Sequence, residues 1–190
     1  MKLPRPKKKG TISLEETLDR RRSKRQFLTK RLSQEQISQL LWAAQGTIQK
    51  GYRTAPSAGG LYPLEIYLVE REGVQHYVPQ SHELERTVDG DVRPQLARAA
   101  LDQGCILEAP VCIVIATEYQ RVERRYDERA ARYVCIEVGH VAQNIHLQAV
   151  AMGLGSVPIG AFDDDQVHKV LFLPEDQKPL YIIPVGYSVA

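Results

Sequence analysis

The sequence has few cysteines, no long apolar run and almost no net charge, and each shortage argues against a class of protein. Only three cysteines occur among 190 residues, and because none forms a Cys-x-x-Cys pair, a disulfide framework or a zinc knuckle is not indicated. No stretch reaches about 18 consecutive apolar residues, so we expect neither a membrane-spanning helix nor a secretory signal. We therefore predict a cytoplasmic protein with no membrane partner.

Charge is nearly balanced overall but unevenly placed along the chain. The 25 basic and 23 acidic residues give a net charge of +2, which is small for a polyanion-binding protein. Twelve basic and three acidic residues fall in the first 31 positions, whereas 13 basic and 20 acidic residues follow. The prolines and lysines of residues 1–10 predict a flexible basic tail, and residues 11–190 suit a single domain. Because the acidic remainder offers no matching face, we disfavour a nucleic-acid-binding arm and predict no nucleic-acid partner.

Hydrophobic spacing predicts an α+β protein with a mixed sheet and helices on its faces. Ser13 and Ser33 each begin a capping box, and Gly46 suits a left-handed helix end. The uninterrupted apolar run at residues 111–116 indicates a strand covered on both faces. The predicted strands cover residues 64–69, 74–78, 111–116, 155–159 and 180–185, and the predicted helices cover residues 13–20, 33–45, 93–101, 123–153 and 163–171.

Several motifs are weaker than they first look. The glycines at 153, 155 and 160 end a helix instead of opening one, so they do not form a dinucleotide fingerprint. Glu137 and His140 have the spacing of half a di-iron site, but no second copy is present, and we predict no metal. Asn144 and Gln148 continue their polar line along an otherwise apolar helix, which must meet protein groups, a second subunit or a polar ligand. No motif for covalent catalysis is found, and the catalytic residues stay unassigned.

Four segments, taken in order, resemble the FMN-dependent nitroreductase family. They are RRSKRQF at residues 21–27, RTAPSAGGLYPLEIYLV at 53–69, EAPVCIVIAT at 108–117, and EVGHVAQNIHLQAVAMGLGSVPIGAFDDDQVHKVLFLP at 137–174. The loop ending Leu-Tyr-Pro-Leu-Glu is most similar to the SagB-type dehydrogenase branch, whose members include oxidases of azoline rings in peptides. The resemblance implies a single nitroreductase-like domain with a mainly antiparallel sheet, flanking helices, a long central helix, and FMN at a homodimer interface.

The resemblance also implies which residues contact the cofactor. Guanidinium and hydroxyl groups in the first segment would bind the FMN phosphate, for which charge-assisted bonds are well suited. The small residues of the second segment would approach the flavin from the partner subunit. A turn after the long helix would place a backbone N–H near flavin N5, with an amide side chain against the ring. The implied cofactor residues are Arg21, Arg22, Ser23, Arg25, Pro56, Ser57, Ala58, Gly59, Gln103, Pro158, Ile159 and Gly160.

The implied activity is ping-pong hydride transfer between NAD(P)H and a small acceptor such as a nitroaromatic or a quinone. FMN is the expected cofactor, NAD(P)H the expected co-substrate, and a small molecule the expected substrate. Two alternatives stay open. One is a SagB-type azoline dehydrogenase that uses FMN and oxygen, and the other is a non-catalytic flavin-binding protein. Tyr62 and His140 are the polar candidates for a general base, but a structural role explains each of them more readily.

Overall fold

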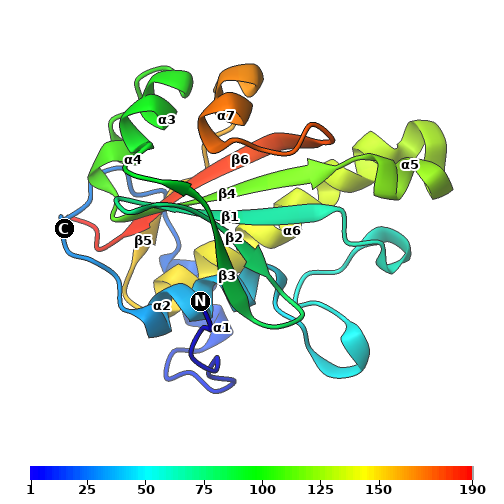
Figure 1. Cartoon of the computed structure of the whole chain (residues 1–190). Helices are drawn as coiled ribbons and strands as arrows, with labels where there is room; N and C mark the ends of the chain where they lie inside the picture. The colour runs from blue at the N-terminus through cyan, green and yellow to red at the C-terminus, as the bar shows by residue number, and fades with distance from the viewer. Residues whose placement is uncertain (190) are drawn as a thin grey trace.

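The computed structural model describes residues 1–189 and is built around one six-stranded sheet (Figure 1). The strand order is β3-β2-β1-β4-β6-β5, and every pair of neighbouring strands runs antiparallel. The α+β class and the mainly antiparallel sheet are therefore confirmed. The strands are β1 (Leu64–Glu70), β2 (Gly73–Val78), β3 (Glu83–Asp89), β4 (Val111–Glu118), β5 (Gly155–Ser156) and β6 (Gln177–Gly186).

Helices cover both faces of the sheet (Figure 1). On one face lie α1 (Leu14–Arg20), α2 (Gln34–Gln45) and the long α6 (Ala130–Ala151), and on the other lie α3 (Arg93–Ala99), α4 (Cys105–Glu108) and α7 (Asp164–Leu171). Helix α5 (Gln120–Tyr126) projects beyond the end of β4. The remaining short turns are η1 (Gln49–Gly51), η2 (Ala58–Gly60) and η3 (Asp127–Arg129).

Strand β4 separates two hydrophobic cores, as its unbroken apolar run predicts. Ile113 packs in the core beneath α2 and α6, whereas Val114 packs in the core beneath α3 and α7. Successive side chains of a strand point to opposite faces, so one apolar segment supplies both cores. This double burial makes β4 the rigid centre on which the surrounding loops are held.

The start of α2 follows the sequence prediction, but its end does not. Ser33 and Gln36 form both bonds of the capping box. Gly46, predicted to be left-handed, has φ −61° and lies in extended backbone. Glycine is needed there for a different reason, because a Cβ would lie 2.7 Å from the carbonyl oxygen of Trp42. At α1, Ser13 accepts the Glu16 N–H at 3.1 Å, but the Glu16 carboxylate pairs with Arg20 instead of completing the box.

The helix predicted over residues 123–153 is broken in the structure. Asp127 has φ 44°, a conformation that a helix does not continue through, so α5 ends there and α6 begins three residues later. Strand β3 was missed because ELERTVD has only a short apolar alternation and is mostly exposed. None of the helices within residues 1–189 has both the length and the apolar character needed to cross a membrane.

The N-terminal residues run along the free edge of β3. Lys2 forms an antiparallel bridge with Glu83, and the Leu3 N–H donates to the His82 carbonyl at 3.1 Å. The Leu3 side chain is buried. The tail over residues 1–10 therefore begins with ordered contacts to the edge strand, and the flexibility expected of it stays a prediction.

Candidate functional site

The basic segment after α1 contains two kinds of arginine. The Arg22 guanidinium donates to the carbonyl oxygens of Asp19 at 2.8 Å and Arg21 at 2.7 Å, so it caps the end of the helix. The side chains of Arg21, Ser23 and Arg25 make no hydrogen bond or ion pair with any group in residues 1–189. Two guanidinium groups and one hydroxyl are thus available as donors within five residues, which is a set that fits a phosphate group.

This segment is held flat against β5. Ser23 forms a parallel bridge with Ser156, and the Lys24 N–H donates to the Ser156 carbonyl at 3.0 Å. The contact is tight, because a Cβ added to Gly155 would lie 2.8 Å from the Lys24 Cβ. Residues 158–160 follow β5 closely in the chain. The predicted phosphate-binding segment therefore lies beside the strand that leads into the predicted ring-binding turn.

Only one of the two backbone N–H groups predicted to face the flavin ring is available. The Ile159 N–H donates to the Ile182 carbonyl at 2.8 Å, and the Ile182 N–H returns the bond at 3.0 Å. Ile159 therefore cannot donate to a ligand from its backbone. The Gly160 N–H is exposed and has no acceptor in the described part of the chain, which leaves Gly160 as the donor of this turn.

Gln103 lies beside the same turn, as its predicted role requires. Its Nε2 donates to the carbonyl oxygens of Ala100 at 3.0 Å and Ala161 at 3.1 Å. The amide group thus ties the end of α3 to the residue after Gly160 and keeps its Oε1 free as an acceptor. A ligand at this turn would meet one N–H donor from Gly160 and one oxygen acceptor from Gln103.

The loop at residues 56–60 (Pro-Ser-Ala-Gly-Gly), called the glycine-rich loop below, packs against α5. Gly59 has φ 62°, and a Cβ there would lie 2.8 Å from a guanidinium nitrogen of Arg125, so glycine is required for both conformation and space. The Ser57 hydroxyl accepts a bond from the backbone N–H of residue 62 at 2.9 Å. The loop is therefore ordered from within, and the Ser57 oxygen already has a protein partner.

A buried polar cluster supports this loop from below. The Gln45 side chain accepts from Arg53 at 3.2 Å and donates to Glu137 at 3.3 Å. Burial raises the pKa of Glu137, although bonds from Ser57 and Gln45 oppose the shift, and burial also lowers the pKa of Arg53. The buried start of the polar line on α6 is thus satisfied by protein groups.

The other polar candidates also have structural roles or lie apart from the site. The phenol oxygen of Tyr62 accepts the Arg53 N–H at 3.2 Å, and its ring lies under the Arg53 guanidinium. His140 is exposed on α6, and Gln148 accepts a bond from Gln39 at 3.0 Å. None of these side chains is arranged as a general base beside the turn at Gly160.

The predicted cofactor residues form two groups at opposite ends of the molecule. In Figure 1 the basic segment runs beside β5 at the left, and the glycine-rich loop lies at the right near α5. Along α6, Glu137 marks the loop end and His146 the basic end, so nine residues, or about 14 Å of helix, separate them. A single protomer does not bring the two groups together.

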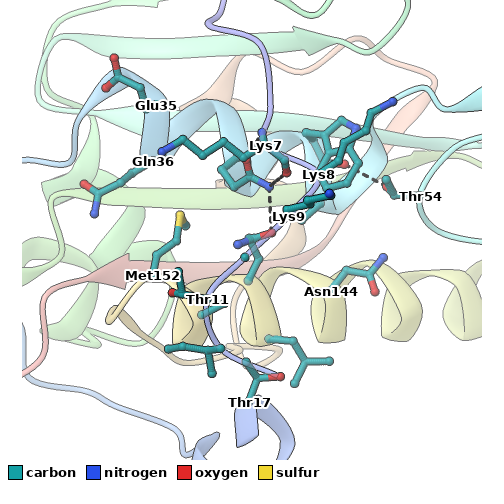
Figure 2. Close-up of a pocket in the computed structure, with 18 of the residues that line it drawn as sticks. Lys7, Lys8, Lys9, Thr11, Thr17, Glu35, Gln36, Thr54, Asn144 and Met152 are labelled. Atoms are coloured by element: carbon teal, nitrogen blue, oxygen red, sulfur yellow. Dashed lines mark hydrogen bonds between the residues drawn. The ribbon is translucent and has the colours of Figure 1, made fainter. Parts of the chain in front are cut away.

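A large cavity of about 1110 Å³ lies elsewhere, beneath the N-terminal segment (Figure 2). Lys7, Lys8 and Lys9 line it from one side, and Asn144 of α6 lines it from another. None of the predicted cofactor residues lines this cavity. The donors suited to phosphate lie instead on the surface beside β5, and we place the candidate site there on the chemistry of those donors.

His146 is a buried residue beside the candidate site, and its contact with β5 was not evident from the sequence. Its side chain is only 4% exposed, and its Nδ1 lies 2.6 Å from the Ser156 hydroxyl. Burial, with a smaller effect from the charge of Arg21, lowers the pKa of His146 to about 4, so the ring is neutral at neutral pH. Sequence spacing gave no signal for this pair, because the contact forms only when β5 folds back on α6.

Known proteins resemble this chain over most of its length. The profile of the Nitroreductase family matches residues 18–187. A Methanocaldococcus jannaschii protein provisionally named a nitroreductase is 44% identical over 185 residues, covering 94% of this chain and 92% of that protein. The NADPH-flavin oxidoreductase of Vibrio harveyi is 31% identical over 110 residues, covering 54% of this chain and 46% of that protein. A solved structure from Ralstonia eutropha JMP134, also provisionally named a nitroreductase, is 29% identical with a TM-score of 0.91. The match covers 100% of this chain and 90% of that chain.

Proposed function

The chain belongs to the nitroreductase family and is a flavin oxidoreductase, and from this premise we propose that it binds FMN between two copies of itself. We further propose that it passes hydride from NAD(P)H to a small acceptor in two separate half-reactions. A nitroaromatic or a quinone is the acceptor class that this proposal names. The cytoplasmic location expected from the sequence stays a prediction.

One observation carries the choice of cofactor. In the described part of the chain, the side chains of Arg21, Ser23 and Arg25 have no hydrogen-bond partner, whereas the Arg22 guanidinium donates to backbone carbonyls at the end of α1. Three free donors on one short segment fit a terminal phosphate, which FMN carries at the end opposite its ring. The Gly160 N–H lies four residues beyond Ser156, which bridges this segment, and the Gln103 side chain is bonded to the carbonyl of the next residue, Ala161, so the ring would follow there.

A two-fold homodimer accounts for the separation of the two residue groups. In such an isologous contact, the loop of one copy reaches the basic segment of the other, and the reverse. Large apolar side chains on the helical layer support a covered surface there. Leu14 and Leu18 of α1 are 60% and 50% exposed, and Ile136 of α6 is 49% exposed. Apolar groups gathered on one layer are typical of a protein contact.

The protein residues then have distinct tasks in the reaction. Bound FMN supplies the hydride chemistry, which no amino-acid side chain provides. Arg21 and Arg25 neutralise the phosphate, and the Ser23 hydroxyl adds a neutral donor. The Gly160 N–H and the Gln103 Oε1 orient the ring edge, and the rigid turn anchored by Ile159 and Ile182 keeps them in place. With no general base positioned at the turn, the protein acts through binding and orientation.

Absorption spectra of the purified protein mixed with FMN test this function. We expect a perturbed flavin spectrum, bleaching by NADPH without air, and return of the oxidised spectrum on adding a quinone. A spectrum identical to free FMN contradicts the proposal. Flavin that binds but resists every hydride donor favours the non-catalytic alternative. Reoxidation by oxygen after reduction by an azoline substrate, without NAD(P)H consumption, favours the azoline dehydrogenase that the loop resemblance suggests.

A further inference from the structure

His146 connects the long helix to the shortest strand of the sheet. Strand β5 has two residues, and its pairing with β6 is continued by the Val157 N–H, which donates to the Pro184 carbonyl at 3.3 Å, and by the two bonds between Ile159 and Ile182. The His146 Nδ1 lies 2.6 Å from the Ser156 hydroxyl, and both residues are almost completely buried. The backbone bonds fix this segment to the sheet, whereas the His146–Ser156 bond is a buried side-chain bond that fixes it to α6.

The phosphate end of the candidate flavin site contacts Ser156 directly. On one side, the Ser156 carbonyl accepts the Lys24 N–H, and Ser156 bridges Ser23 of the basic segment. On the other side, the chain runs from Ser156 through one residue, Val157, into the turn over residues 158–160. The Ile159–Ile182 bonds hold this turn to β6, so a shift of Ser156 relative to α6 acts first on the phosphate donors.

Packing alone does not account for a histidine at this position. The His146 Nε2 is the one buried side-chain nitrogen or oxygen within residues 1–189 that has no hydrogen-bond partner. An unpaired buried polar atom destabilises a fold, and a leucine would fill the same apolar surroundings without that cost. The bond at Nδ1 is the feature of the ring that a leucine lacks.

We infer that His146 is a positioning residue for the flavin: by binding Ser156 it holds β5 against α6 and thereby sets the position of the phosphate donors in the basic segment. This inference rests on the proposed function, because it assumes that these groups bind FMN. His146 acts through Ser156 and does not itself touch the cofactor.

Three substitutions of His146 separate this role from simple packing. His146→Asn places an amide where Nδ1 lies, His146→Gln places it where the unpaired Nε2 lies, and His146→Leu has no polar group. We expect the FMN dissociation constant to rise about tenfold for Leu and Gln, and to stay within about twofold of wild type for Asn. Ser156→Ala matches the Leu variant from the other side of the bond, and the two changes together are expected to cost no more than either alone.

The controls separate failure of this inference from failure of the function. Gln148→Leu removes another hydrogen bond of α6, to Gln39, and is expected to leave FMN affinity unchanged. Thermal unfolding confirms that each variant is folded, and Ser156→Ala serves if a His146 variant is not. If wild type does not bind FMN, the proposed function fails. If wild type binds FMN and both His146→Leu and Ser156→Ala bind it equally well, or if Asn loses as much affinity as Leu, this inference is overturned.

Discussion

The guanidinium of Arg22 donates to the carbonyl oxygen of Asp19 at 2.8 Å and so belongs to the end of α1. Arg21, its neighbour in the chain, carries the same charge but has no hydrogen-bond or ion-pair partner among residues 1–189. We therefore propose different functions for the two adjacent arginines, in which Arg22 closes the helix and Arg21 binds a ligand.

Replacing Arg21 and Arg22 separately tests this difference. Arg21→Gln removes a charge-assisted bond to the phosphate, so we expect FMN affinity to fall by about 10- to 100-fold. Arg22→Gln removes a helix cap and is expected to lower thermal stability slightly while changing FMN affinity less than about threefold. Fluorescence titration of FMN measures both. Equal losses from the two variants would refute the assignment of the free donors.

The backbone N–H of Gly160 is tested by a pair of substitutions at one position. Gly160→Ala keeps the N–H, and its Cβ would meet Tyr181 at an ordinary 3.5 Å, so we expect near wild-type reduction by NADPH. Gly160→Pro removes the N–H, and we expect the rate of flavin reduction to fall about tenfold or more. Anaerobic stopped-flow absorbance gives both rates. Similar rates for Ala and Pro would show that this donor is not used.

Gly46 provides a prediction about the fold that is independent of the cofactor. Its φ is −61°, so alanine is not strained by conformation, but the new Cβ would lie 2.7 Å from the Trp42 carbonyl oxygen. We expect Gly46→Ala to destabilise the protein by about 2 kcal/mol because the backbone at the end of α2 must move. Gly10→Ala, with no atom nearer than 3.9 Å, is the matched control. Urea unfolding compares the two, and equal stabilities would contradict the crowding seen at Trp42.

The buried His146 predicts a loss of stability in mild acid. Its pKa is lowered from 6.5 to about 4 in the folded chain, mainly by burial, so the unfolded chain takes up a proton that the folded chain refuses. Stability therefore falls as pH decreases from about 6.5 to 4, by on the order of 3 kcal/mol from this group. The difference in unfolding free energy between wild type and His146→Leu isolates the effect. A difference that does not change with pH in this window would rule it out.

Much of the fold was predictable because its signals are local. The capping box at Ser33 and the apolar run of β4 are readable from neighbouring residues, and both are present as predicted. Strand β3 was not, since its polar sequence gains its place only by pairing with β2. The break at Asp127 was also hidden, because a single left-handed residue interrupts a continuous helical pattern.

For the candidate site, the sequence suggests residue types, but it does not indicate which of these residues already have protein partners. The basic run suggests a phosphate-binding segment. Only the folded chain shows that the Arg22 side chain is bonded to helix carbonyls, whereas the Arg21 side chain has no hydrogen-bond partner among residues 1–189. Likewise, the sequence suggests the backbone N–H groups of both Ile159 and Gly160 as donors to the ring. The bridge to Ile182 uses the Ile159 N–H, so only Gly160 is left as a donor. Such choices depend on partners distant in sequence, which spacing does not encode.

The central claim is that each flavin site is built from the basic segment of one copy and the glycine-rich loop of the other. Two variants test it when they are mixed after unfolding and refolding together. Arg21→Gln damages the segment, and Pro56→Glu places a repelling carboxylate on the loop, so each variant alone is expected to bind FMN poorly. In the mixture, half of the dimers are mixed and each has one intact site, so about a quarter of the wild-type FMN sites should return. Recovery of no sites, in a mixture that contains mixed dimers and with wild type binding FMN normally, would contradict the shared site.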